Sequence, residues 1–168
     1  MGLHYEHLNE RVRAHMVEEL DLDLEGGRGV YISKRFNERG RELWPELLRE
    51  ALAHGTDISL EEALWANDCF KFHHKGSRVA ETAGQTLAED QFNRYYLRAL
   101  CRIAQEDGIG QVEVIRAGHV SQPRFSSNAL IGALLDVGPL LESLRSNHVS
   151  KALGLRPGAN SRLSARLP

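Results

Sequence analysis

The residues of this chain best suited to chemistry are its arginines, which outnumber the lysines seventeen to four. The planar guanidinium group forms paired hydrogen bonds with phosphate and carboxylate oxygens. One group of basic residues lies in segment 26–41, and a second group repeats every fourth residue further along the chain. Together they are the candidate phosphate-binding residues, namely Arg28, Lys34, Arg35, Arg39, Arg41, Arg94, Arg98 and Arg102.

The first group begins at a glycine-rich break, GGRG. Glycines allow close backbone approach and amide nests that bind anions. Residues 26–41 carry a formal charge of about +4, because Glu38 is their only carboxylate, and Tyr31 and Phe36 lie among the cations. Cations mixed with aromatic side chains are typical of nucleic-acid surfaces, although a glycine-rich turn with solvated charges has the same composition.

The second group lies on a helix that we predict over residues 86–108, followed directly by a strand. Thr86 and Glu89 have the spacing of a capping box, and Gly108 can close the helix. Apolar residues cover more than half of its circumference, which predicts a mostly buried helix. Asn93 falls inside this apolar arc, so we expect its amide to hold a neighbouring loop backbone rather than to take part in catalysis.

Arg94, Arg98 and Arg102 lie one above another on a single face of this helix. Like charges at this spacing destabilise a helix unless something negative lies opposite. That partner is a carboxylate-rich surface of this chain, another protein or a phosphate backbone. The alternative is a solvated ridge with internal salt bridges.

An acidic segment, Glu19 to Glu25, alternates carboxylates with leucines. As a strand it would place the carboxylates on one side; as a helix end it would expose them. Asp21 and Asp23 fit the h-[DE]-h-[DE]-h pattern, which resembles the metal motif of nucleotidyltransferases. That resemblance implies a bound magnesium ion. Residues 8–12, LNERV, do not supply the Gly-Ser phosphate turn of those enzymes.

Arg49 and His54 form an R-x4-H spacing that resembles the active-site motif of HEPN-type ribonucleases. The resemblance implies nuclease chemistry without a metal. The chain departs from that motif at Glu50, where another polar residue usually follows the arginine.

Segment 67–78, NDCFKFHHKGSR, holds four side chains able to bind zinc, but it lacks the paired C-x2-C or H-x3-H spacing of a zinc site. We therefore expect no metal and no cofactor. The simpler interpretation is a basic loop, from Lys71 to Arg78, whose charges can join those of segment 26–41.

The helices and strands that we predict around these residues indicate an α+β fold. We expect one helix-dominated domain over 1–168 with a small sheet of about three short strands, near 29–33, 111–119 and 161–167. Helices are expected from Tyr5 to Leu20, after Asn37, after Ser59 with Glu62 as its capping partner, across SSNALIGALL, and from Pro139. A short turn, PGANS, precedes the last strand.

Composition narrows the function. Hydrophobic content of 42% and charged content of 26% are typical of globular proteins, and a net charge of −2 excludes a globally basic nucleic-acid binder but allows a local basic patch. Cys69 and Cys101 form no disulfide framework, and the start of the chain reads as no signal peptide, so we expect a cytoplasmic setting. No apolar run reaches membrane-spanning length, so no membrane partner is expected.

These observations favour a phosphate-directed protein that binds DNA or RNA through an arginine-rich surface. One alternative is a protein-interaction component, such as an inhibitor, an adaptor or a homo-oligomer subunit, which docks on another protein or on itself through segments 17–25 and 26–41. Another is a metal-dependent enzyme that handles phosphoryl groups or nucleotides. No G-x-S-x-G elbow, P-loop or H-E-x-x-H motif indicates a different enzyme class.

Overall fold

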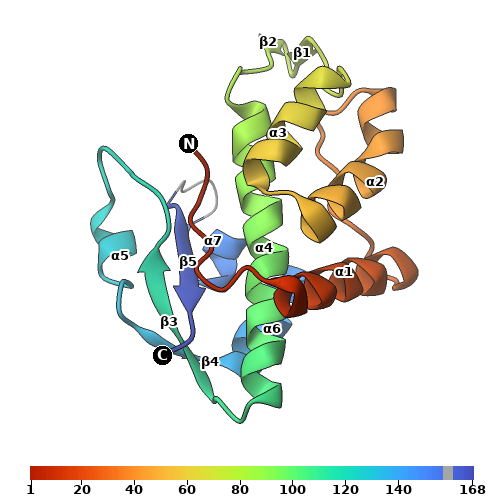
Figure 1. The fold of residues 1–168 in the computed structure, drawn as a ribbon. Coiled ribbons are helices and arrows are strands. Elements are labelled where there is room, and N and C mark those ends of the chain that lie inside the picture. The colour runs from red at the N-terminus through yellow and green to blue at the C-terminus, as the bar shows by residue number, and fades with distance from the viewer. Residues whose placement is uncertain (157–160) are drawn as a thin grey trace.

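The computed structural model describes residues 1–156 and 161–168 and has an α+β fold in which helices predominate. Helix α4 (Ala83–Glu106) runs through the centre, with three helices packed on one side and a small sheet on the other (Figure 1). The three helices are α1 (Glu10–Glu25), α2 (Glu38–His54) and α3 (Asp57–Ala66).

The prediction of a mostly buried central helix is confirmed, because 18 of the 24 residues of α4 are buried. Its predicted start is wrong: the helix begins at Ala83, and Thr82, in the cap position, makes no side-chain capping bond. Thr86 and Glu89 therefore lie inside the helix. The Glu89 carboxylate accepts from Arg162 over 2.8 Å rather than from a cap amide.

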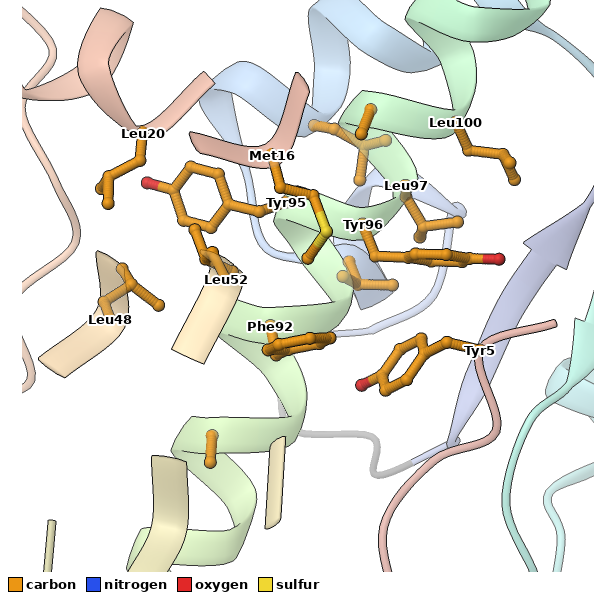
Figure 2. Close-up of a cluster of buried hydrophobic side chains, with 14 of the residues drawn as sticks. Tyr5, Met16, Leu20, Leu48, Leu52, Phe92, Tyr95, Tyr96, Leu97 and Leu100 are labelled. Atoms are coloured by element: carbon orange, nitrogen blue, oxygen red, sulfur yellow. The ribbon is translucent and has the colours of Figure 1, made fainter. Parts of the chain in front are cut away.

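The core forms where aromatic residues of α4 meet the N-terminal segment and α1 (Figure 2). Tyr5 packs on Phe92 and Tyr96, with ring centroids 4.9 and 5.0 Å away. Tyr5 was expected inside the first helix, but α1 starts only after Asn9, whose side chain accepts from the Val12 amide. The remaining labelled core residues in the figure are Met16, Leu20, Leu48, Leu52, Tyr95, Leu97 and Leu100.

The helix ends in this half of the molecule follow local capping chemistry. The Asn37 side chain accepts from the Gly40 amide at the start of α2, and Gly55 ends that helix, both as predicted. Helix α3 instead starts after Thr56, which forms a capping box with Ser59, so the predicted Ser59–Glu62 pair is wrong.

The sheet is antiparallel with strand order β4-β3-β5, comprising β3 (Gln111–Arg116), β4 (Leu134–Asp136) and β5 (Leu163–Arg166). The strands predicted near 111–119 and 161–167 are confirmed. The one predicted near 29–33 is wrong, since that segment joins no ladder among the described residues. The third strand, β4, is formed by the last two residues of SSNALIGALL together with Asp136, and only α5 (Phe125–Asn128) is helical in that region. The PGANS turn falls largely on residues 157–160, outside the described residues.

Behind α4 lie α6 (Val137–Ser146), which carries Pro139 in its first turn, and the short α7 (Val149–Ala152). Within the described residues, every helix is too short or too polar to cross a lipid bilayer.

A two-stranded hairpin, β1 (His73–His74) and β2 (Ser77–Arg78), projects beyond α3 at the top of Figure 1. Its turn residues, Lys75 and Gly76, both have positive φ, 51° and 79°, as in the tight turns that suit short hairpins. The stem of this hairpin pairs with the segment before α2. An isolated bridge joins Phe36 to Phe70, and the Lys71 amide donates to the Arg35 carbonyl over 2.8 Å.

Candidate functional site

Arg98 lies in the core with no solvent exposure. Its Nε donates to the Glu19 carboxylate and its Nη1 to the Asp23 carboxylate, each over 2.7 Å. The Tyr95 hydroxyl donates to the same Asp23 oxygen over 2.6 Å. The carboxylate-rich segment of this chain is therefore the partner of Arg98, and this guanidinium reaches no surface.

The two other arginines of the ridge also have partners within the chain. Arg94 is buried and donates to the carbonyls of Leu144 and Arg145, satisfying the C-terminal end of α6. Arg102, about a quarter exposed, pairs with Glu18 over 2.8 Å. The ridge thus fastens α4 to α1 and α6, and the structure removes Arg94 and Arg98 from the candidate phosphate-binding surface.

Segment 19–25 is helical, and two of its carboxylates, Glu19 and Asp23, are buried rather than exposed. Burial by itself raises the pKa of Glu19, but hydrogen bonds and charge from Arg145 and Arg98 outweigh it and leave the pKa below its usual range. Asp21 forms an ion pair with Arg49. Across residues 1–156 and 161–168, no group of three or more His, Cys, Asp or Glu side chains is placed to hold a metal ion.

The cations of segment 34–41 have a different setting. Lys34, Arg35, Arg39 and Arg41 are exposed and form no ion pair with any described residue, whereas Arg28 pairs with Glu142 over 3.3 Å. Segments 34–41 and 68–78 together hold seven Lys and Arg residues against two carboxylates. Because the hairpin stem pairs with the segment before α2, the cations next to this pairing lie close together, whereas Arg41 lies further along, within α2. We call the following six the basic patch: Lys34, Arg35, Arg39, Lys71, Lys75 and Arg78.

The pKa of His74 reflects this gathering of charge. Loss of hydration lowers it first, and the positive charges of Lys71, Lys75, Arg35 and Lys34 lower it further. Cations from both segments therefore act on one imidazole, which requires them to lie close together. The basic loop predicted over residues 71–78 does join the charges that precede α2.

The hairpin adds an exposed aromatic ring to the basic patch. Phe72 is 67% exposed, and the Arg78 guanidinium lies 5.1 Å from its ring centroid. His73 packs edge-on against the same ring at 4.6 Å. Unpaired nucleic-acid bases stack on exposed aromatic rings of this kind, which lie beside cations.

A pocket of about 330 Å³ adjoins the basic patch through Arg35, which belongs to both. Tyr31, Ser33 and Arg35, from the segment that precedes α2, line one wall. The first half of α4 forms a second wall, with Asp90 and Asn93 three residues apart on one face. The turn into α7 and the start of β5 complete the enclosure, and Leu87, Val149 and Leu163 supply apolar lining.

An imidazole held by a carboxylate lies in this pocket. Nδ1 of His148 is 2.7 Å from Oδ2 of Asp90, and the Gln91 side-chain amide donates to the same oxygen over 2.9 Å. The ring of Tyr31 packs edge-on against the imidazole at 4.6 Å. A carboxylate only accepts, so Nδ1 carries a proton and Nε2 of a neutral His148 is left as an acceptor.

The pocket contains two cations with no ion pair among the described residues, Arg35 and Lys151. A third, Arg162, is already neutralised by Glu89. Cations and an oriented imidazole around an apolar lining suit an anionic ligand with an apolar body.

Sequence reasoning missed the members of this pocket that come from the C-terminal third. Asp90 and His148 are 58 residues apart, and no motif or spacing connects them. Asn93 has the predicted structural role, but it holds a strand and not a loop: its Nδ2 donates to the Leu163 carbonyl over 2.8 Å, and its Oδ1 accepts from the Ser164 hydroxyl over 2.7 Å. It therefore holds β5, which forms part of the pocket wall.

No family model, curated protein or solved structure matches this chain. The functional conclusion below therefore rests on the geometry of the basic patch and the pocket.

Proposed function

We propose that this protein binds single-stranded nucleic acid through the basic patch. One observation carries the proposal: the hairpin stem pairs with the segment before α2, so cations from two segments more than thirty residues apart lie beside each other with no ion pair among the described residues. The guanidinium groups of Arg94, Arg98 and Arg102 bind carbonyls and carboxylates within the chain, so that group does not contribute. Lysines and arginines of the patch would displace counterions from phosphates, which makes the affinity depend on salt.

The preference for a single strand follows from Phe72. Its ring is exposed at the base of the hairpin, beside Arg78 and His73, where an unpaired base can stack. Bases in a duplex are already stacked on each other and do not reach such a ring. The Phe72→Ala variant should therefore lose single-strand affinity by about 1–3 kcal/mol and leave duplex affinity almost unchanged.

Fluorescence anisotropy with a labelled single strand of about 15 nucleotides tests the proposal, since one binding surface of this kind covers up to roughly 16. Affinity should fall linearly with the logarithm of salt concentration. The Lys71→Ala/Lys75→Ala variant should lower the steepness of that line by about 1.4, or about 0.7 for each phosphate that is no longer neutralised.

The matched control is Arg11→Ala/Arg124→Ala, which removes two exposed cations outside the basic patch and changes the net charge equally. It should retain the wild-type affinity and salt dependence. Binding that ignores salt, binding that is absent at low ionic strength, or an equal loss in both double variants would refute the proposal.

A further inference from the structure

We propose that the pocket is a catalytic site for metal-independent RNA cleavage, with His148 as the general base that activates a ribose 2′-hydroxyl. This inference rests on the proposed function, because the basic patch must deliver the strand. It moves the catalytic role away from Asp21, Asp23, Arg49 and His54, none of which lines the pocket.

The orientation of His148 is the first step. Asp90 fixes the proton on Nδ1, and Gln91, which is fully buried, holds the Asp90 oxygen in turn. Nε2 has no partner among the described side chains, and the His148 side chain is 46% exposed. An accessible imidazole with a carboxylate on its other nitrogen is the arrangement that general-base catalysis requires.

The second step is charge. Attack on a phosphodiester builds negative charge on the phosphoryl oxygens, which nearby cations stabilise. Arg35 and Lys151 line the same pocket, and neither is neutralised by a carboxylate of the described chain. Lys151 follows His148 by three residues through the single turn of α7, which keeps the two side chains on one side of that turn.

The third step is the path of the strand. Arg35 is a member of both the basic patch and the pocket lining, so a backbone bound along the patch continues into the pocket. A volume of about 330 Å³ is near the lower end for ligand pockets, which suits one nucleotide rather than a folded polymer. The apolar lining from Leu87, Val149 and Leu163 can cover one base.

The reaction balances without a metal or an oxidant. Nε2 of His148 takes the proton of the 2′-hydroxyl, and the 2′-oxygen forms a bond to phosphorus. The bond from phosphorus to the 5′-oxygen breaks, and that oxygen takes a proton from solvent water. His148 later returns its proton to solvent, so the products are a 2′,3′-cyclic phosphate and a 5′-hydroxyl end.

The experiment uses the full chain, EDTA, and a DNA strand that contains a single ribonucleotide. Cleavage should occur only on the 3′ side of that ribonucleotide and leave the cyclic phosphate. An all-DNA strand and a strand with a 2′-O-methyl group should bind equally and stay intact. The rate should rise with pH in the wild type, because a general base acts only in its unprotonated form.

Two variants test the assignment. His148→Asn should slow cleavage by about 100-fold or more, the usual contribution of a general base, with unchanged binding and no imidazole-dependent rise with pH. Lys151→Ala should slow cleavage with little effect on binding, because Lys151 lies outside the basic patch. Arg11→Ala/Arg124→Ala should cleave like wild type.

The outcomes separate this inference from the proposed function. Binding without cleavage of the ribonucleotide overturns the catalytic assignment and leaves nucleic-acid binding standing. Cleavage that persists in His148→Asn, or that cuts the all-DNA strand, also overturns it. Absence of any binding overturns both. If His148→Asn unfolds early in a thermal scan, Lys151→Ala decides, because full activity in that variant contradicts the charge stabilisation proposed here.

Discussion

Replacing Arg98 by Met tests whether buried ion pairs fasten the central helix to α1. Methionine keeps most of the length and apolar volume but removes the charge and the bonds to Glu19 and Asp23. Losing one partner of a buried pair costs about 3–5 kcal/mol. Glu19 keeps Arg145 and Asp23 keeps the Tyr95 hydroxyl, so we expect the lower end, about 3 kcal/mol, from a total of roughly 5–15 kcal/mol.

The stability lost on replacing Arg98 by Met should be smaller at acidic pH than at neutral pH. In the wild type the folded-state pKa of Glu19 is lowered despite burial, so its stabilisation is complete above the unfolded pKa, about 4.3, and is lost as pH falls through the folded value. Removing Arg98 removes one of the two arginines that lower this pKa. The Arg98→Met variant therefore loses less stability on acidification. The difference in free energy of unfolding between wild type and variant should narrow as the pH falls.

Urea unfolding followed by the fluorescence of Trp44 and Trp65 measures both effects, at about pH 7.5 and at about pH 3, which is below the unfolded pKa of Glu19. In thermal unfolding at the higher pH, the expected fall in the Tm of Arg98→Met is roughly 6–12 °C. The control is Arg102→Met, which removes a pair with Glu18, about half exposed, and only a 3.6 Å contact with the buried Glu19; it should cost less than about 1 kcal/mol. An Arg98→Met variant within about 1 kcal/mol of wild type at the higher pH, or an equal gap at both pH values, would refute the reasoning.

Three further predictions concern single buried positions. Asn93→Leu should lower the free energy of unfolding by about 1–3 kcal/mol, measured by urea titration, because it leaves two polar groups of β5 unpaired. Gly40→Ala should cost about 1–3 kcal/mol in the same assay because its Cβ would overlap the Cys69 carbonyl oxygen, whereas Gly138→Ala, in open space on α6, should be neutral or stabilising. The Cys101 thiol should resist a thiol reagent near neutral pH until the protein is unfolded, because burial raises its pKa to about 12; rapid labelling of the native protein would contradict this.

Strong periodicity made part of the fold predictable. The wide apolar arc of α4 indicated a buried helix, and the alternation in β3 and β5 indicated strands. β4 was not predictable, because a short apolar run fits either a helix or a strand, and the pairing of Val112 with Leu135 decides between them. The strand predicted at residues 29–33 was wrong because a strand-like composition does not supply a neighbouring strand to pair with.

The candidate site was predictable only in part. Local composition identified Lys34, Arg35 and Arg39, since a run of cations with few acids remains positive wherever it is placed. The hairpin charges could be named but not located, because long-range contacts, such as the bridge from Phe36 to Phe70 and the bond from the Lys71 amide to the Arg35 carbonyl, bring them beside that run. The pocket needed the whole fold, as no local pattern connects α4 with α7.

The arginines of α4 have partners within the chain and those of the basic patch do not, and this difference follows from the geometry of two helices. Arg94, Arg98 and Arg102 repeat every four residues, and Glu19 and Asp23 share the same spacing on α1, so the two rows can meet when the helices pack. Glu19 and Asp23 of the acidic segment thus neutralise Arg98, and neither forms an ion pair with the basic patch. Unopposed like charges repel and oppose folding. An anion bound to the patch would offset this repulsion, and that is the physical reason for assigning function to these cations rather than to the ridge.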